Sequence, residues 1–313
     1  PQRLEYCCHQ DATRDWYGRH LGLATIFLIP ALLGVQITLK TDRISVQIDG
    51  KPFTELYMGK EARKPFLYPL RTASGIQVTR GPGDPTDHPH QKGLWVGAEH
   101  LSGMDFWEND PSYQRPHMGT IVFKDVLDMK NGSFTMLSDW VSLEGESVLS
   151  ETRTMTFYAE PKDCRMFDVD LHLRAKKDLT FEDHHDAVIG IRLRSAFDEK
   201  NGGLAANAQG AKGEANARGQ RSEWVDWQAA VEGETIGVAL MDHPMNFGFP
   251  TRWHIRSMGL LVASPFAQHD YSALAPDGGK KLHASEELHL RYRVLIHPAA
   301  FDVKSVYRGF AEK

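Results

Sequence analysis

A two-residue alternation of apolar and polar side chains dominates this chain from residue 36 onward. It is clearest over residues 167–174, where Phe, Val, Leu and Leu alternate with Asp, Asp, His and Arg. Successive side chains of a strand point to opposite faces, so this pattern predicts strands with one buried face. Other segments with the same pattern are 37–48, 76–78, 94–96, 121–123, 134–143, 148–157, 189–193, 236–240, 259–263 and 288–296.

Helical periodicity is almost absent. Only residues 299–312 have the spacing of a helix, with Phe301, Val306 and Phe310 as apolar contacts. Many short strands with Gly and Pro turns predict an all-β fold, either a sandwich or a barrel. We expect a single β-sandwich domain over residues 36–313. The Gly-, Ala- and Asn-rich stretch 198–222 is expected to be a long loop within it.

The N-terminal extension, residues 1–35, contains a segment typical of a secretory signal. Arg19 and His20 precede an apolar run at residues 21–33. This run is shorter than the roughly 20 residues of a membrane-spanning helix, and a basic flank before a short apolar core indicates export. The segment 19–35 therefore predicts a periplasmic or secreted protein with no stable membrane insertion after signal removal. The alternative is a buried N-terminal helix. One interpretation of residues 1–18 is an over-extended start of translation.

Charge and missing motifs exclude several classes of function. The formal net charge is −5, and no basic patch suits a phosphate backbone, so nucleic acid is not expected as a partner. The three Cys have no metal-binding or redox spacing. The motifs of serine hydrolases, P-loop NTPases, Rossmann dehydrogenases and zincin proteases are also missing.

The richest cluster of reactive groups is the stretch 84–95, which reads Asp-Pro-Thr-Asp-His-Pro-His-Gln-Lys-Gly-Leu-Trp. Its two prolines restrict the backbone, so a stiff loop presents two imidazoles, an amine and two carboxylates. Imidazole exchanges protons near neutral pH, and Lys92 can neutralise a developing negative charge. His88 and His90 are therefore candidate acid/base groups.

A second segment far downstream supplies matching chemistry. His254 and Arg256 lie two residues apart in a strand-like run, so both should point to one face. We expect His254 to act as the opposing acid/base group and Arg256 to stabilise negative charge. The stretch 84–95 and the segment 253–256 should then line one pocket.

Metal binding is an open alternative to metal-free acid/base chemistry. Asp87, His88 and His90 could supply ligands from one loop edge, and Asp84 with the His-His-Asp run 184–186 could add more. We expect no cofactor, with a divalent metal as this alternative.

Aromatic and acidic residues suit a ring-shaped polar ligand, because indole faces stack on sugar rings. In the run 222–227, indoles and carboxylates alternate, which predicts one aromatic and one acidic side. Further carboxylates follow the His-containing loop, and a pair of them could serve glycosidic chemistry. The candidate substrate-binding residues are Trp95, Glu99, Trp224, Asp226, Asn246 and Trp253.

The chain resembles the PmoA-like family of bacterial exported proteins over about residues 36–311. The segments that carry the resemblance are 64–71, Gly81, 87–95, 224–226, 242–244, Asn246, 250–251, 253–256 and 265–266. One departure is Gln91, where a third His is expected. The resemblance implies a large, twisted antiparallel β-sandwich of the galactose-mutarotase type and a carbohydrate ligand. The family name refers to a methane monooxygenase subunit, but such a subunit needs several apolar helices that this chain lacks.

These observations lead to three hypotheses. The first is an exported carbohydrate-active enzyme that uses His-based acid/base chemistry, of the hydrolase, lyase or epimerase type. The second is a non-catalytic carbohydrate-binding protein. The third is a metal-dependent oxygenase or hydrolase.

Overall fold

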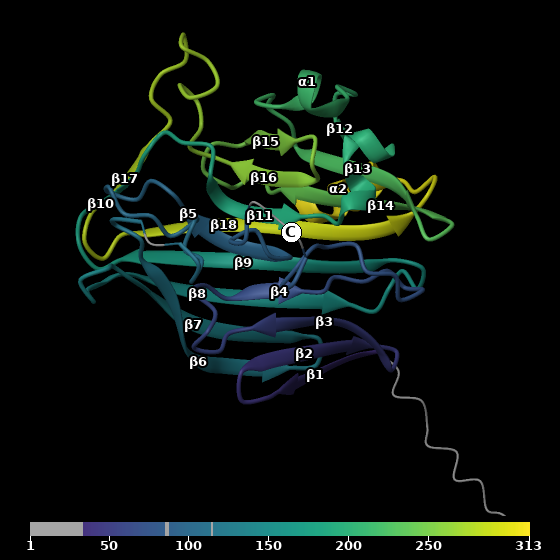
Figure 1. The fold of residues 1–313 in the computed structure, drawn as a ribbon, viewed down its shortest axis with the longest axis horizontal. Coiled ribbons are helices and arrows are strands. Elements are labelled where there is room, and N and C mark those ends of the chain that lie inside the picture. The colour runs from purple at the N-terminus through teal and green to yellow at the C-terminus, as the bar shows by residue number, and fades with distance from the viewer. Residues whose placement is uncertain (1–33, 85–87, 114) are drawn as a thin grey trace, which may run out of the picture. The chain divides into compact units, whose positions relative to one another are not determined.

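The computed structural model describes residues 34–84, 88–113 and 115–313, and its strands form two eight-stranded antiparallel sheets (Figure 1). All strand pairs recorded within these sheets are antiparallel, so the predicted all-β fold is confirmed. The first sheet has the order β1 (Val35–Leu39), β2 (Arg43–Ile48), β3 (Lys51–Tyr57), β4 (Phe66–Tyr68), β5 (Leu94–Ala98), β11 (Ala187–Arg192), β16 (Leu260–Ser264) and β15 (Arg252–Arg256).

The second sheet contains the longer strands. Its order is β12 (Leu204–Asn207), β13 (Trp224–Val231), β14 (Glu234–Asp242), β18 (Glu287–Pro298), β9 (Arg165–Ala175), β8 (Ser147–Tyr158), β7 (Ser133–Val141) and β6 (Thr120–Lys130). A separate two-stranded ribbon joins β10 (Leu179–Phe181) to β17 (Lys280–Leu282). The predicted strands 134–143 and 148–157 are neighbours in this sheet, because β7 pairs with β8 across the turn at 142–146.

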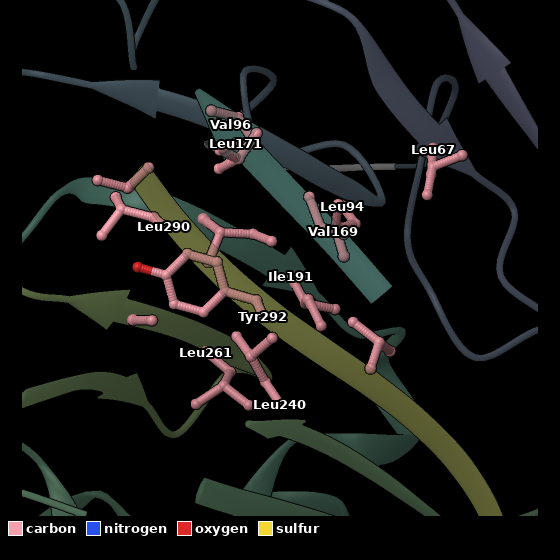
Figure 2. Close-up of a cluster of buried hydrophobic side chains, with 14 of the residues drawn as sticks. Leu67, Leu94, Val96, Val169, Leu171, Ile191, Leu240, Leu261, Leu290 and Tyr292 are labelled. Atoms are coloured by element: carbon pink, nitrogen blue, oxygen red, sulfur yellow. The ribbon is translucent and has the colours of Figure 1, made fainter. Parts of the chain in front are cut away.

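One apolar core lies between the two sheets. Figure 2 shows Leu94 and Ile191 from the first sheet beside Val169, Leu240 and Tyr292 from the second. All five side chains are fully buried. The alternation in each strand produces this layer, since every second residue points inward. The inward residues of β15 are Trp253 and Ile255, so His254 between them points to the outer face, which is the face turned away from the second sheet.

Helices are short in the described part of the chain. The predicted C-terminal helix is confirmed as α2 (Val303–Ala311), whose N-cap Asp302 accepts a hydrogen bond from the Ser305 backbone. Val303, Tyr307 and Phe310 of α2 pack on the second sheet. No helix among the described residues is long and apolar enough to cross a membrane.

Two predictions of local structure were wrong. Residues 198–222 contain β12, the short helix α1 (Gly213–Ala217) and the 3-10 turn η2 (Glu199–Asn201), rather than one long loop. The buried residues there are small, such as Ala205 and Ala217, and they carry little periodic signal. Residues 76–78 were predicted to be a strand, but this short segment forms only isolated bridges. One joins Gln77 to Arg71, and another joins the adjacent Thr79 to Leu193. The predicted signal segment lies almost wholly outside the described residues.

Candidate functional site

Residues from four strands line up across the outer face of the first sheet. His254 of β15 lies opposite Val262, Val262 lies opposite Gly190, and Gly190 lies opposite Trp95 of β5. Because neighbouring strands are about 4.8 Å apart, three strand steps separate His254 from Trp95 by roughly 14 Å. The two sequence segments predicted to share a pocket therefore share one face of one sheet.

Four imidazoles form a continuous stack at one end of this face, and we call His100, His184, His185 and His254 the imidazole stack. Ring centroids are 4.1 Å apart for His100 and His184, 4.4 Å for His184 and His185, and 4.2 Å for His185 and His254. Antiparallel pairing of β5 with β11 brings the end of the first strand to the start of the second. A chain segment that follows β5 thus meets one that precedes β11.

Carboxylates flank the stack on both sides. The Glu99 backbone donates a hydrogen bond of 2.9 Å to the Asp186 carbonyl, which places their side chains together. Burial raises the pKa of Asp186 well above its usual value, and the neighbouring Glu99 charge raises it further. A raised pKa favours the protonated form of the Asp186 carboxyl group. On the other side, Asp270 lies 2.5 Å from Nδ1 of His185.

Two imidazoles of the stack, His184 and His254, have pKa values well below physiological pH. Burial lowers the pKa of His254 to about 2, with a further contribution from His185. Burial likewise lowers the pKa of His184 to about 4. The His184 Nδ1 accepts a 3.3 Å hydrogen bond from the Asp186 backbone. A neutral imidazole can accept a proton from a ligand without first losing one.

A cavity of about 490 Å³ opens beside the stack. This volume is within the usual range for small-molecule sites. The Tyr271 hydroxyl lies 2.6 Å from Nδ1 of His254. Arg256 contacts Glu214 at 3.0 Å, so its charge is already balanced by a lining carboxylate. The lining residues are His185, Glu214, Ala215, Arg218, Asp270 and Tyr271.

The predicted residues His88, His90 and Lys92 form a second group together with Lys64 and Asp110. We call these five residues the lysine–histidine cluster. The rings of His88 and His90 are 5.7 Å apart, and Lys92 contacts Asp110 at 2.6 Å. Burial lowers the pKa of His90 to about 2 and that of Lys64 to about 7. The open space there is only about 10 Å³, enough for one water molecule at most.

The two groups share a sheet face but do not merge. His185 and Tyr271 line the cavity beside the stack, whereas His90 and Lys92 line the small space in the lysine–histidine cluster. Asp105 lies near enough to influence Lys64 in one and Asp186 in the other. Asp87 lies outside the described residues, so the metal alternative built on Asp87, His88 and His90 stays a prediction.

Two of the indoles predicted to stack on a sugar ring, Trp95 and Trp253, are buried. Trp95 packs on Trp107 with centroids 5.0 Å apart, and both are at most 1% exposed. Trp253 points into the core, where its Nε1 donates to the Ser222 carbonyl at 2.8 Å. Neither indole presents a face to the cavity in this structure.

Three predicted substrate-binding residues lie on or beside the second sheet instead. Trp224 packs on Tyr307 of α2, and Asp226 lies 3.1 Å from Nε2 of His297. Asn246 donates to Asp242 at 2.7 Å. The prediction of one aromatic and one acidic side for residues 222–227 was wrong. Trp224 and Asp226 are two residues apart and therefore share a face, while Trp227 points into the core.

The sequence analysis missed several members of the site. Glu99 and His254 were predicted, but His100, Asp270 and Tyr271 were not. The run 184–186 was considered only as a supplement to a metal site in the 84–95 loop. Its position immediately before a buried strand was the available signal.

A larger cavity, of about 780 Å³, lies at the opposite end of β11. Its charges are partly paired, with Arg194 2.6 Å from Glu232 and Lys200 3.7 Å from Asp198. No histidine is among the described residues that line it. It lacks the neutral bases found at the imidazole stack. Its other charged lining residues are Arg71, Arg80, Asp84 and Arg192.

The model of a family of unknown function, DUF6807, matches residues 43–310. The chain belongs to this family. A search of curated proteins finds no similar sequence.

Solved structures similar to this DUF6807 chain include a galactose mutarotase-like protein from Lactobacillus casei and a putative aldose 1-epimerase from Escherichia coli. Each has 9% identity and a TM-score of 0.41, covers 84% of this chain, and is itself covered to 100% and 99%. A putative kojibiose phosphorylase from human microbiome has 6% identity and a TM-score of 0.38, with 90% of this chain and 36% of that one covered. TM-scores of this size do not support a statement about function.

Proposed function

We propose that this protein is an enzyme that transfers protons to and from a carbohydrate bound beside the imidazole stack. The observation that carries the proposal is the convergence of stacked imidazoles of lowered pKa and a carboxyl group of raised pKa beside an open cavity that His185 lines. Groups whose pKa values are displaced in opposite directions are characteristic of acid/base sites.

His184 and the Glu99–Asp186 pair supply the two halves of the chemistry. Neutral His184 accepts a proton from a substrate carbon or hydroxyl group. Asp186, whose raised pKa favours the protonated form, donates a proton to another substrate oxygen beside Glu99. The site ends one reaction with His184 protonated and Asp186 ionised, and return of the proton through solvent or product restores it. This sequence fits an epimerase, a lyase or a hydrolase.

The cavity chemistry favours a polyhydroxylated ligand. Carboxylates from Glu214 and Asp270, the Arg218 guanidinium and the Tyr271 hydroxyl offer both donors and acceptors around the same space. Sugar hydroxyl groups need such mixed partners.

The test is a panel of aldoses and glycosides incubated with the protein in D2O and followed by proton NMR. Product formation, or exchange of a carbon-bound hydrogen for deuterium, is the expected result. His184→Ala and Glu99→Gln should each lower the rate at least 100-fold, in line with the usual contribution of a general acid or base.

His283→Ala is the matched control. His283 is exposed and contacts Asp178 at 3.2 Å, outside the imidazole stack. Its loss should leave the rate unchanged. Saturable sugar binding with no exchange and no product would support the non-catalytic alternative and overturn the enzyme proposal.

Export remains part of the proposal and is supported by the basic flank and apolar run at residues 19–33. Expression of the full chain with a C-terminal tag, followed by cell fractionation, tests it. Recovery only in the cytoplasmic fraction would contradict export.

A further inference from the structure

Three groups of side chains among the described residues have potential metal-ligand atoms within 4.8 Å of one another. They are Glu99 with His100 and His184, Asp170 with His172 and His289, and His185 with Asp186 and His254. A tetrahedral ion with bonds of about 2.0–2.1 Å holds its ligand atoms about 3.4 Å apart. Geometry and hydrogen bonding distinguish the three groups.

The two groups that contain parallel rings are poorly arranged for a metal. His100 and His184 are stacked with an interplanar angle of 0°, and His172 and His289 with 13°. Ring nitrogens in parallel planes direct their lone pairs side by side rather than toward a common point. In the second case Asp170 already contacts Nε2 of His289 at 2.8 Å.

The third group has rings that are inclined to each other and oriented by neighbours. His185 and His254 are tilted by 32°. Asp270 holds Nδ1 of His185 at 2.5 Å, and the Tyr271 hydroxyl holds Nδ1 of His254 at 2.6 Å. Metal-binding histidines characteristically use one ring nitrogen for the ion and the other for such an orienting partner. The Nε2 atoms are therefore the ones available to a ligand.

Asp186 provides an observation that is independent of the ring geometry. Its Oδ1 atom is buried and has no hydrogen-bond partner among the described residues. Its Oδ2 atom lies 3.8 Å from Nε2 of His185, beyond hydrogen-bond distance. An unsatisfied buried carboxylate oxygen is costly unless a proton or a cation compensates it.

We propose that His185, Asp186 and His254 bind one divalent transition-metal ion through two Nε2 atoms and a carboxylate oxygen. The cavity lined by His185 leaves further coordination positions for water or a substrate oxygen. Two imidazoles and one carboxylate with open positions suit zinc or iron(II). The inference rests on the location of the proposed active site. A bound ion would pair with the Asp186 carboxylate in place of a proton and would itself polarise the substrate oxygen that Asp186 otherwise protonates, while His184 and Glu99 remain for proton transfer.

Calorimetric titration of the chelator-treated full chain with Zn²⁺ tests this assignment. We expect one equivalent of Zn²⁺ to bind. Co²⁺ bound in its place should give visible absorption bands typical of a site with few ligands. Asp186→Asn and His254→Ala should weaken Zn²⁺ binding at least 100-fold. Tyr271→Phe should weaken it about tenfold, because it removes an orienting hydrogen bond.

His172→Ala is the control, since it removes an exposed imidazole from one of the other groups. Less than one equivalent of Zn²⁺ bound by the unchanged protein would overturn the proposal. So would unchanged binding in Asp186→Asn, or loss of binding in His172→Ala. The Co²⁺ spectrum of the unchanged protein keeps the test informative if a variant does not fold.

The sugar panel separates this inference from the proposed function. Turnover that persists after complete chelation, without metal binding, would reject the metal alone. Stoichiometric metal binding in a protein with no turnover or exchange would reject the enzyme proposal alone.

Discussion

Replacing His254 with Gln should make the protein less sensitive to acid. Burial and the neighbouring His185 hold the pKa of His254 at about 2, whereas an imidazole in the unfolded chain has a pKa of about 6.5. The unfolded state therefore binds a proton that the folded state does not, at every pH between these values. The stabilising contribution is complete above pH 6.5 and is lost as pH falls.

The size of the effect follows from the unfolded-state pKa alone, as long as the folded value lies below about 4. Between pH 7.5 and pH 5.0, protonation of the unfolded imidazole stabilises the unfolded state by about 2 kcal/mol. His254→Gln cannot titrate, so its free energy of unfolding should fall by about 2 kcal/mol less over this range. The other titrating groups are common to both proteins.

Urea unfolding followed by tryptophan fluorescence, at both pH values and with a chelator present, measures the loss of unfolding free energy in the unchanged protein and in His254→Gln. His283→Gln serves as the control, because its imidazole is exposed. Equal losses in the unchanged protein and in His254→Gln would refute the assignment of a neutral, buried imidazole at this position.

Three further predictions concern the core and the outer face. Glu151→Gln should cost about 3–5 kcal/mol of stability, seen as a lower Tm, because the fully buried Glu151 carboxylate is 2.6 Å from Nε of the equally buried Arg153; an unchanged Tm would contradict this. Trp95→Ala should cost about 3–5 kcal/mol in urea unfolding, since Trp95 is fully buried. Loss of sugar affinity with unchanged stability would instead support a stacking role. Gly190→Ala should cost about 1–3 kcal/mol, because the new methyl group would lie 2.7 Å from Trp95 and 2.9 Å from Trp107; a neutral effect would mean that these indoles move freely.

The strands were predictable because buried apolar side chains alternate with more exposed polar side chains along them. Over residues 167–174 of β9, inward residues are apolar and outward ones polar, so the sequence pattern predicts this strand directly. The region 198–222 was not predictable in this way. Its buried residues include Ala205 and Ala217, and small side chains pack closely without leaving an apolar period.

The site was predictable only in part. His254 was predicted to face a pocket. It points to the outer face because Trp253 and Ile255 on either side enter the core, and it contacts the cavity-lining Tyr271. Its partners depend on which strands pair. Only the pairing of β5 with β11 brings Glu99 to the run 184–186, and local sequence contains no record of that long-range pairing. For the same reason, Trp95 was predicted to bind the substrate, although Trp107 packs against it in the structure.

A side-by-side comparison of His184→Ala and His90→Ala tests the central claim most directly. Both variants remove an imidazole on the same sheet face, but only His184 contacts a ring that lines an open cavity. On the sugar panel in D2O, we predict that His184→Ala loses at least 100-fold in turnover and that His90→Ala retains most of it. Loss of turnover in His90→Ala with full activity in His184→Ala would contradict the account and place the chemistry in the lysine–histidine cluster.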